Sequence, residues 1–295
     1  LDLRDDTTGA NGGTLTAWSI KICEEPPLPS CPAGFTRTTV FSTDFESGAA
    51  GFTHSGAQDE WQLGLPNTAA TTTANPVAAF TTCNSGVNCW KTDLTGTYNA
   101  SSNQDLLSPN INLAGFSGPV IVTWAMRHQI ETANFDHMFI DFQQVGGATP
   151  VRLYEWMDPT PISASAGTGN PQENIGGSYG WGVFSRRVDS LAGLNTEIRF
   201  HLDSDTTVQF GGLAIDDVSV TACQPCPAIT CPNNIVTNTD PGQCSAVVNY
   251  TPPTSAGCTV TCTPASGSTF QRGTTTVSCN NGGSSTCDFT VTVND

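Results

Sequence analysis

The 295-residue sequence is poor in positive charge and in charged side chains altogether. Lysine and arginine together number 10 against 26 aspartates and glutamates, which gives a net charge of -16 at pH 7. Nucleic acids and anionic membrane surfaces bind basic surfaces, so this shortage of cations argues against both as partners. Charged residues make up only 12% of the chain, too few for the outer faces of long amphipathic helices. The composition therefore predicts an all-β fold.

A membrane-spanning run and a leader are also missing from the sequence. No apolar stretch approaches the roughly 18 residues that cross a bilayer. The chain opens with Leu1-Asp2-Leu3-Arg4 rather than with a basic and then apolar segment. A secreted protein without a leader is either a mature product or an excerpt. We expect an excerpt, taken from the carboxyl-terminal part of a larger secreted or cell-surface protein.

Cysteine, by contrast, is abundant. Six of the 12 cysteines lie between Cys231 and Cys287, and this density predicts disulfides formed in an oxidising, extracellular compartment. A zinc site is the alternative for Cys223 and Cys226, which have the CxxC spacing. No second pair and no histidine follows at the distance that a zinc site needs, so disulfides are favoured.

Two local pairings are suggested by position along the chain. Cys83 and Cys89 flank a polar loop of five residues and are expected to close it. The proline-rich stretch 24–34 predicts a stiff linker, and Cys23 and Cys31, which bracket its residues 24–29, could pair across them. The connectivity of the remaining cysteines cannot be read from their spacing.

Residues 1–23 predict a β-hairpin. Residues 1–6 and 14–22 alternate apolar and polar side chains as strands do, and the stretch between them is rich in turn residues. The run Gly13-Thr14-Leu15-Thr16-Ala17-Trp18-Ser19-Ile20 resembles the closing strand of a P domain (Homo B domain), the module that follows the catalytic domain in proprotein convertases and many bacterial subtilisin-like proteases. A lone hairpin is marginal in water. The resemblance therefore implies the terminal hairpin of a longer domain, or a hairpin that completes its sheet against another molecule.

Residues 35–224 contain many short strand-like runs between long Gly, Thr and Ser loops, which predicts a jelly-roll β-sandwich. Asp44-Phe45-Glu46, Gly51-Phe52, Trp61-Gln62-Leu63-Gly64 and Ala214-Ile215-Asp216-Asp217-Val218 resemble the pattern of MAM-like jelly rolls, including those beside secreted bacterial proteases. Thr43 stands where the animal family has a cysteine. The disulfide set of that family therefore does not transfer to this chain.

Residues 225–295 carry a third pattern. The runs Cys231-Pro232-Asn233-Asn234-Ile235, Gly242-Gln243-Cys244-Ser245-Ala246, Gly273-Thr274-Thr275-Thr276-Val277 and Cys287-Asp288-Phe289-Thr290-Val291 resemble the hyalin repeat (HYR) family. The resemblance implies an immunoglobulin-like sandwich that serves in adhesion or as a spacer. Because so short a segment builds a small core, we expect disulfides to contribute to its stability.

No catalytic site is predicted. A nucleophilic Ser or Cys needs a positioned histidine base, and the sequence has no Gly-x-Ser-x-Gly elbow. Its four histidines form no His-Glu-x-x-His motif. We therefore expect a protein that is not itself an enzyme, although its parent could carry a protease domain upstream.

Clustered carboxylates are the candidates for metal binding. Asp44 and Glu46 begin the jelly roll, Asp216 and Asp217 end it, and the first and last strands of such folds usually lie side by side. Carboxylates that close would repel unless a cation lay between them, so we predict a structural Ca²⁺ there. The alternative is that these groups pair with backbone amides or face water. A second candidate is the loop pair Asp203 and Asp205.

Exposed aromatic rings are candidates for glycan contact, because sugar faces stack on them. The residues concerned are Trp90, Trp156, Trp181 and Tyr179. Core packing is the alternative role for each of them.

These features together favour non-catalytic structural or adhesive modules of a large secreted or cell-surface bacterial protein. The expected partners are other modules of the same protein, a cell-surface protein or glycan, or copies of the chain in a polymer. One alternative is a set of accessory domains at the C-terminal end of a secreted subtilisin-like or metalloprotease, as the P-domain resemblance suggests. A second alternative is a carbohydrate-binding module.

Overall fold

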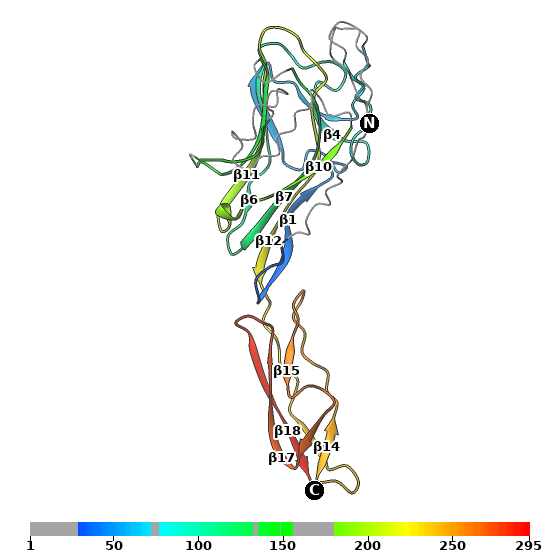
Figure 1. The fold of residues 1–295 in the computed structure, drawn as a ribbon, viewed down its shortest axis with the longest axis vertical. Coiled ribbons are helices and arrows are strands. Elements are labelled where there is room, and N and C mark those ends of the chain that lie inside the picture. The colour runs from blue at the N-terminus through cyan, green and yellow to red at the C-terminus, as the bar shows by residue number, and fades with distance from the viewer. Residues whose placement is uncertain (1–28, 72–76, 132–134, 148, 156–179) are drawn as a thin grey trace, which may run out of the picture.

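The computed structural model describes residues 29–71, 77–131, 135–147, 149–155 and 180–295. These residues form two β-domains that follow one another along the long axis of the molecule (Figure 1). The predicted all-β fold is confirmed, since the described elements are strands apart from one short 3-10 turn. No described helix has the length and apolarity that crossing a membrane requires. The hairpin predicted for residues 1–23 lies outside the described residues.

The first domain is a sandwich of two antiparallel sheets. Sheet A has the strand order β10-β7-β12-β4-β3, with β1 beside β12. Its strands are β1 (Phe35–Thr43), β3 (Trp61–Gly64), β4 (Cys89–Thr92), β7 (Ser117–Gln129), β10 (Gly182–Arg187) and β12 (Gly212–Pro225). Sheet B has the order β2-β5-β11-β8-β9, with β6 beside β11. Its strands are β2 (Thr53–Ala57), β5 (Asn103–Leu107), β6 (Ile111–Asn112), β8 (His137–Gln144), β9 (Val151–Glu155) and β11 (Asn195–Asp203).

Alternation along the strands builds the core between the two sheets. In β7 the side chains of Val120, Val122, Trp124 and Met126 are buried on the inner face. In β11 every second residue of Thr196–Leu202 faces the same core, because successive side chains of a strand point to opposite faces. The outer face of sheet B therefore carries the polar and charged residues of its strands.

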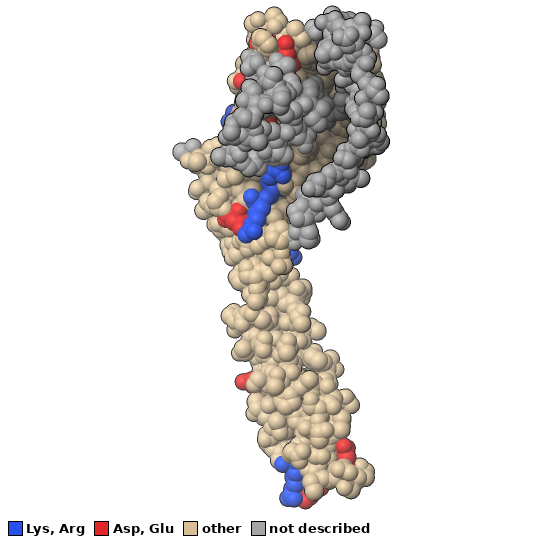
Figure 2. Space-filling model, in the orientation of Figure 1, with Lys and Arg blue, Asp and Glu red and all other residues tan. Residues whose placement is uncertain are grey.

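The second domain is a smaller sandwich with the immunoglobulin-like order. One sheet has the order β13-β18-β17-β15, and β14 and β16 form the other. The strands are β13 (Ile235–Asn238), β14 (Ser245–Val248), β15 (Thr261–Thr263), β16 (Ser268–Gln271), β17 (Gly273–Asn280) and β18 (Thr286–Asn294). Phe270, Val277 and Phe289 fill its narrow core. Charged side chains are sparse on the face of this domain that Figure 2 shows.

Five disulfides join the described cysteines. They link Cys31 with Cys223, Cys83 with Cys89, Cys226 with Cys258, Cys231 with Cys287, and Cys262 with Cys279. Closure of the 83–89 loop is thus confirmed, whereas the suggested pairing of Cys23 with Cys31 is wrong. Strand β1 pairs with β12 so that Arg37 lies opposite Cys223, and this pairing brings Cys31 to the end of β12. Cys244 is an exposed free thiol.

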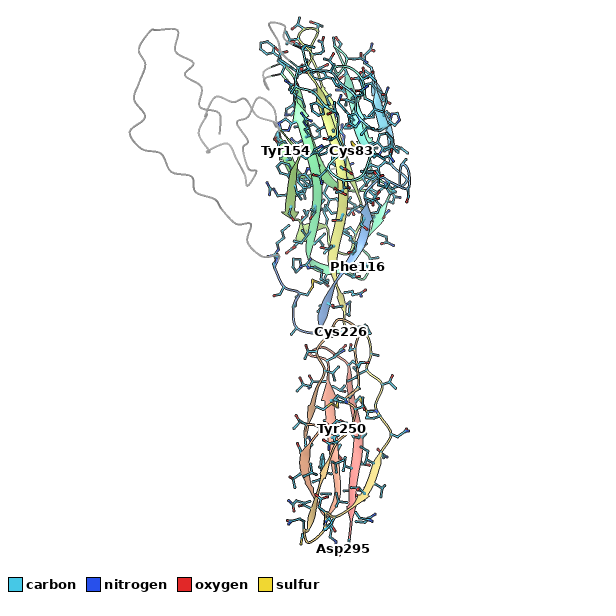
Figure 3. The ribbon with its side chains drawn as sticks, turned by 90° about the vertical axis from the view of Figure 1, so that its right-hand side faces the viewer. Cys83, Phe116, Tyr154, Cys226, Tyr250 and Asp295 are labelled. Carbon is cyan, nitrogen blue, oxygen red and sulfur yellow. A yellow bond between two sulfur atoms is a disulfide. The ribbon has the colours of Figure 1, made fainter. Side chains whose placement is uncertain are left out.

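The junction between the domains is tightly packed. Cys226, which Figure 3 shows between the two domains, donates its backbone N–H to the carbonyl oxygen of Gly34 over 2.8 Å. Gly34 has a φ of +80°, and a Cβ there would lie 2.3 Å from the Cα of Gly283. A Cβ on Gly257 would similarly meet the Thr36 hydroxyl oxygen at 2.4 Å. Glycine is therefore required on both sides of the junction.

Candidate functional site

Three of the four carboxylates predicted at the ends of the jelly roll gather around the loop that Cys83 and Cys89 close. One oxygen of Asp216 accepts hydrogen bonds from the backbone N–H groups of Asn84 and Ser85, over 2.9 and 3.0 Å. One oxygen of Glu46 accepts from the N–H groups of Val87 and Asn88, over 2.9 and 2.7 Å. The first and last strands therefore do meet in space, as the sequence predicted.

Asp217 and Gly86 complete this arrangement. The carboxylate of Asp217 accepts from the Asn84 side-chain amide over 2.6 Å and from the Ser85 hydroxyl over 2.8 Å. A Cβ on Gly86 would lie 2.2 Å from the Glu46 carboxylate carbon, so a larger residue there would displace that carboxylate. Asp217 sits at an irregularity in the pairing of β12 with β7 and has a left-handed φ of +46°. That backbone kink turns two successive carboxylates toward one loop.

Asp44 takes a different place from the other three. Its carboxylate accepts the N–H of Glu46 over 3.2 Å, and it is exposed. Together with Asp217 it lines a polar groove of about 390 Å³, formed where β1 ends beside β12. The loop amides thus satisfy Glu46, Asp216 and Asp217, which is the alternative to a metal site. Calcium at this set stays a prediction.

Burial shifts the pKa of one member of this cluster, Asp216. The Asp216 side chain is withdrawn from water, and this burial raises its pKa to about 6, although the N–H groups of Ser85 and Asn84 act in the opposite direction. The neighbouring carboxylate of Asp217 raises that pKa further. Negative charge is therefore concentrated here, but backbone donors compensate a large part of it.

The second predicted pair is separated in the structure. Asp203 lies 4.0 Å from the Nε2 atom of His201. Asp205 instead joins Glu131 and Asp136, and one oxygen of each of these three carboxylates lies within 4.8 Å of the others. Hard cations such as Ca²⁺ prefer this kind of oxygen-rich set. Glu131 and Asp136 were missed because they lie between β7 and β8, about 70 residues before Asp205 in the chain.

Hydrogen bonds and burial define this three-carboxylate cluster. Asp136 is fully buried, accepts the N–H of Asp205 over 2.8 Å, and accepts the phenol O–H of Tyr98. The Tyr98 oxygen in turn accepts the N–H of Glu131 over 3.1 Å. Burial raises the pKa of Asp136, of Glu131 and of Tyr98, and the acidic neighbours raise the pKa values of both carboxyl groups further.

The aromatic candidates fall into three groups. Trp90 is 5% exposed and belongs to the core between the sheets, so it fills the packing role that was the alternative to glycan contact. Trp181 is half-buried, and its indole N–H donates to the carbonyl oxygen of Thr82 over 3.0 Å. Trp156 and Tyr179 lie outside the described residues.

A charged layer on the outer face of sheet B surrounds Phe139. His201 stacks on this ring with centroids 4.3 Å apart, and the Arg152 guanidinium lies 4.0 Å from the ring centroid. Arg199 and His201 both contact Asp105, at 2.7 Å. Burial alone would raise the pKa of Asp105, but hydrogen bonds from His201 and Arg199 outweigh it and hold the pKa below its ordinary value. Apart from the strand alternation, no pattern in the sequence pointed to this layer.

A buried cation lies on the outer face of sheet A. The Lys91 ammonium is fully buried and donates to the carbonyl oxygens of Thr92, Asp93 and Gly96 over 2.9, 2.6 and 3.3 Å. Burial lowers its pKa to about 8. Three backbone carbonyl oxygens thus bind the side-chain ammonium of Lys91.

The second domain matches a known family. Residues 223–293 match the HYR domain family. The resemblance expected for residues 225–295 is therefore confirmed. Five disulfides in the described residues, together with this domain, indicate an extracellular location.

The chain also resembles several known proteins at low identity. Bacillopeptidase F of Bacillus subtilis (strain 168) is 28% identical over 190 residues, which are 64% of this chain and 11% of that protein. The chain thus spans about a tenth of the curated relative it matches.

Two solved structures illustrate the likeness of fold. The K3 cleaved adhesin domain of Lys-gingipain from Porphyromonas gingivalis W83 shares 18% identity and covers 62% of this chain and 98% of its own, with a TM-score of 0.34. The CBM22-1 xylan-binding domain from Paenibacillus barcinonensis shares 11% identity and covers 66% of this chain and 99% of its own, with a TM-score of 0.32. These likenesses concern the β-sandwich fold alone.

Proposed function

We propose that the chain is a non-catalytic, extracellular pair of modules within a large secreted bacterial protein. In this proposal the HYR domain is a spacer, and the jelly roll is the head that it displays to a partner. The packed junction carries the proposal. Disulfides end on both sides of it, at Cys31–Cys223 and Cys226–Cys258, and glycines allow the two backbones into contact. A packed junction of this kind fixes the orientation of one domain relative to the other, and a spacer requires such a fixed orientation.

The described titratable residues support a non-catalytic role. His201 has Asp105 on its Nδ1 atom at 2.7 Å, but its Nε2 atom faces Asp203 at 4.0 Å rather than a hydroxyl or thiol. His54 and His137 pair with Asp59 and Glu155. A nucleophilic mechanism needs a base whose free nitrogen reaches Ser, Thr or Cys. Among the described residues, the hydrogen bonds of these three histidines do not include a Ser, Thr or Cys partner.

Two measurements on the whole chain test the proposal. Small-angle scattering is expected to give one elongated particle with a fixed distance between the domains. Incubation with peptide and glycan substrates is expected to give no turnover. Hydrolysis that disappears in Asp105→Asn and His201→Gln variants with normal melting temperatures would overturn the non-catalytic role. A broad distribution of interdomain distances would overturn the spacer role.

A second candidate function is that of accessory domains in a secreted protease. The observation in its favour is the 28% identity to Bacillopeptidase F over 190 residues. The P-domain resemblance of residues 13–20 points the same way. Sequencing the gene upstream of the codon for Leu1 tests it directly. An Asp/His/Ser protease domain there would support accessory modules, and its absence would overturn them.

A third candidate is carbohydrate binding by the jelly roll. Trp181 is the described aromatic candidate that is not part of the core, and Phe139 lies among planar charged groups on the outer face of sheet B. A glycan array is the test. Binding that is lost in Trp181→Ala or in Phe139→Ala would support this function. No binding, or binding that both variants retain, would count against these two surfaces.

A further inference from the structure

Two disulfides create a short covalent route through the molecule. Cys31 is bonded to Cys223 across 192 residues, and Cys231 to Cys287 across 56. Eight residue steps lead from Cys223 to Cys231, and eight more lead from Cys287 to Asp295. The covalent route from Cys31 to Asp295 thus has 16 residue steps, whereas the backbone needs 264.

Most of this route is already extended in the folded protein. Its first part follows the end of β12 to Pro225, and its last part follows β18 from Cys287 to Asn294. Strands rise about 3.3 Å per residue, close to the longest reach of a chain. Figure 3 shows Cys226 between the domains and Asp295 at the far tip of the second domain. The route therefore runs the whole length of the HYR domain with little slack.

The jelly roll lies beside this route rather than in it. Its first strand begins at Phe35, opposite Pro225 at the end of its last strand, so the chain enters and leaves at one end of the domain. The Cys31–Cys223 bond closes that entrance. A pull on the chain before Cys31 and after Cys223 passes through this bond. The sheets of the jelly roll then carry no load.

We propose that Cys31–Cys223 and Cys231–Cys287 form a load-bearing strap, with the jelly roll carried as an unloaded pendant. Most of the HYR domain is bypassed in the same way, and β18 alone carries the tension along it. This inference rests on the proposed function for the source of tension, a large extracellular protein that is held at both ends. It adds that the displayed head keeps its fold while the spacer is pulled.

Single-molecule force spectroscopy tests the strap, with the oxidised chain held by its two ends. At about 3.6 Å per residue, the 16 steps of the route and residues 1–30 together lengthen to at most about 170 Å. In Cys31→Ser/Cys223→Ser the 192 residues of the jelly-roll loop join the load path, which adds a lengthening of about 690 Å. Cys83→Ser/Cys89→Ser is the matched control, because that bond lies inside the pendant. It is expected to add none.

A second measurement avoids any dependence on how the serine variants fold. A protease site is inserted at the exposed turn of Gly146, between β8 and β9, with all disulfides left intact. After cleavage the tether is expected to hold under load, and the protein to separate into two pieces only on a reducing gel. Immediate rupture of the cut tether, or a lengthening near 690 Å in the uncut wild type, would overturn the strap.

The two proposals fail in different ways. Force traces without long steps, together with free interdomain bending in scattering, would keep the strap and overturn the spacer. Long steps together with a fixed interdomain distance would overturn the strap and keep the spacer.

Discussion

The two domains stabilise the same kind of sandwich by different means. Among the described residues, the jelly-roll core contains 28 buried residues, including Trp61 and Trp124, whereas the HYR core contains 10. The HYR domain compensates with disulfides: Cys231–Cys287 and Cys262–Cys279 lie within it, and Cys226–Cys258 closes its entrance. Cys31–Cys223 likewise closes the entrance of the jelly roll, but the one bond inside the described jelly roll, Cys83–Cys89, closes only a short surface loop.

This contrast follows from size. A domain of about 70 residues buries a smaller fraction of its surface than one of about 190, so burial contributes less per residue to its stability. Disulfides stabilise a domain through its unfolded state, because the loops that they close reduce the conformational entropy of the unfolded chain. The HYR domain is therefore expected to be the more sensitive of the two, both to loss of core volume and to loss of an internal disulfide.

The largest effect is expected from truncating one core phenylalanine in each domain. Phe289→Ala and Phe200→Ala both remove a buried ring, a change that costs roughly 3–5 kcal/mol. That loss is expected to unfold the HYR domain at 37 °C, while the jelly roll melts earlier but stays folded. Every tryptophan of the chain precedes residue 225, so tryptophan fluorescence follows the first part of the chain and hydrogen exchange follows the second. Equal shifts in the two domains would contradict the contrast.

Removing an internal disulfide is also expected to destabilise the HYR domain more than the jelly roll. Cys231→Ser/Cys287→Ser opens a loop of 56 residues and is expected to destabilise the HYR domain by about 4 kcal/mol. Cys83→Ser/Cys89→Ser opens a loop of six and is expected to cost the jelly roll about 2 kcal/mol. Urea unfolding that is monitored separately in each domain measures both. A larger loss in the jelly roll would show that loop length is not the governing variable.

Acid is expected to act on the jelly roll through His128. This side chain is fully buried, and burial lowers its pKa to about 4, below its ordinary value of 6.5. The unfolded state binds the proton first as the pH falls, so stability is lost between pH 6.5 and pH 4, by at most about 3 kcal/mol. Asp216 opposes this over part of the range, because its pKa is raised and its folded state binds protons more readily.

Comparing the acid stability of the wild type with that of His128→Gln isolates the contribution of this histidine. Urea midpoints measured at pH 7 and pH 4 are expected to diverge less in the variant than in the wild type. Asp216→Asn is the companion variant, and it is expected to lose more stability on acidification than the wild type does. If the midpoints of His128→Gln fall with pH as steeply as those of the wild type, titration elsewhere governs acid stability.

Calcium is expected to affect one domain only. Binding to the folded state at 100 times the dissociation constant stabilises by about 2.7 kcal/mol. We expect calcium to raise the melting temperature of the jelly roll and to leave that of the HYR domain unchanged. Asp205→Asn tests the cluster with Glu131 and Asp136, and Asp217→Asn tests the loop cluster. Asp288→Asn, an exposed change in the HYR domain, is the matched control. A melting temperature that chelator leaves unchanged would refute both sites.

Sequence patterns predicted those features that depend on neighbours in the chain. Strand alternation, the HYR pattern and the closure of the 83–89 loop all follow from local order. That Glu46 and Asp216 lie at the same loop was also predictable, because jelly rolls place their first and last strands together. The sequence could not show that loop amides would satisfy these carboxylates, since those donors belong to the backbone.

Features that depend on contacts between distant segments could not be predicted from the sequence. The partner of Cys31 depends on the pairing of β1 with β12, which no cysteine spacing reports. Likewise, Asp205 lies beside Glu131 and Asp136 because the connection from β7 to β8 lies near the end of β11. The pair Asp203 and Asp205, which are close in sequence, was therefore the wrong set of ligands to predict. Burial decided the role of Trp90, and burial is a property of the packed sandwich.

The junction also bears on how these modules can be exchanged between proteins. A recombination event that cuts between Pro225 and Cys226 separates Cys226 from the Gly34 carbonyl and sets Gly257 and Gly283 against an unrelated surface. Few foreign domains present glycines where two backbones must touch. Residues 31–295 are therefore expected to be inherited as one cassette, and libraries of shuffled modules should yield folded products when crossovers fall before Cys31 rather than at residue 225.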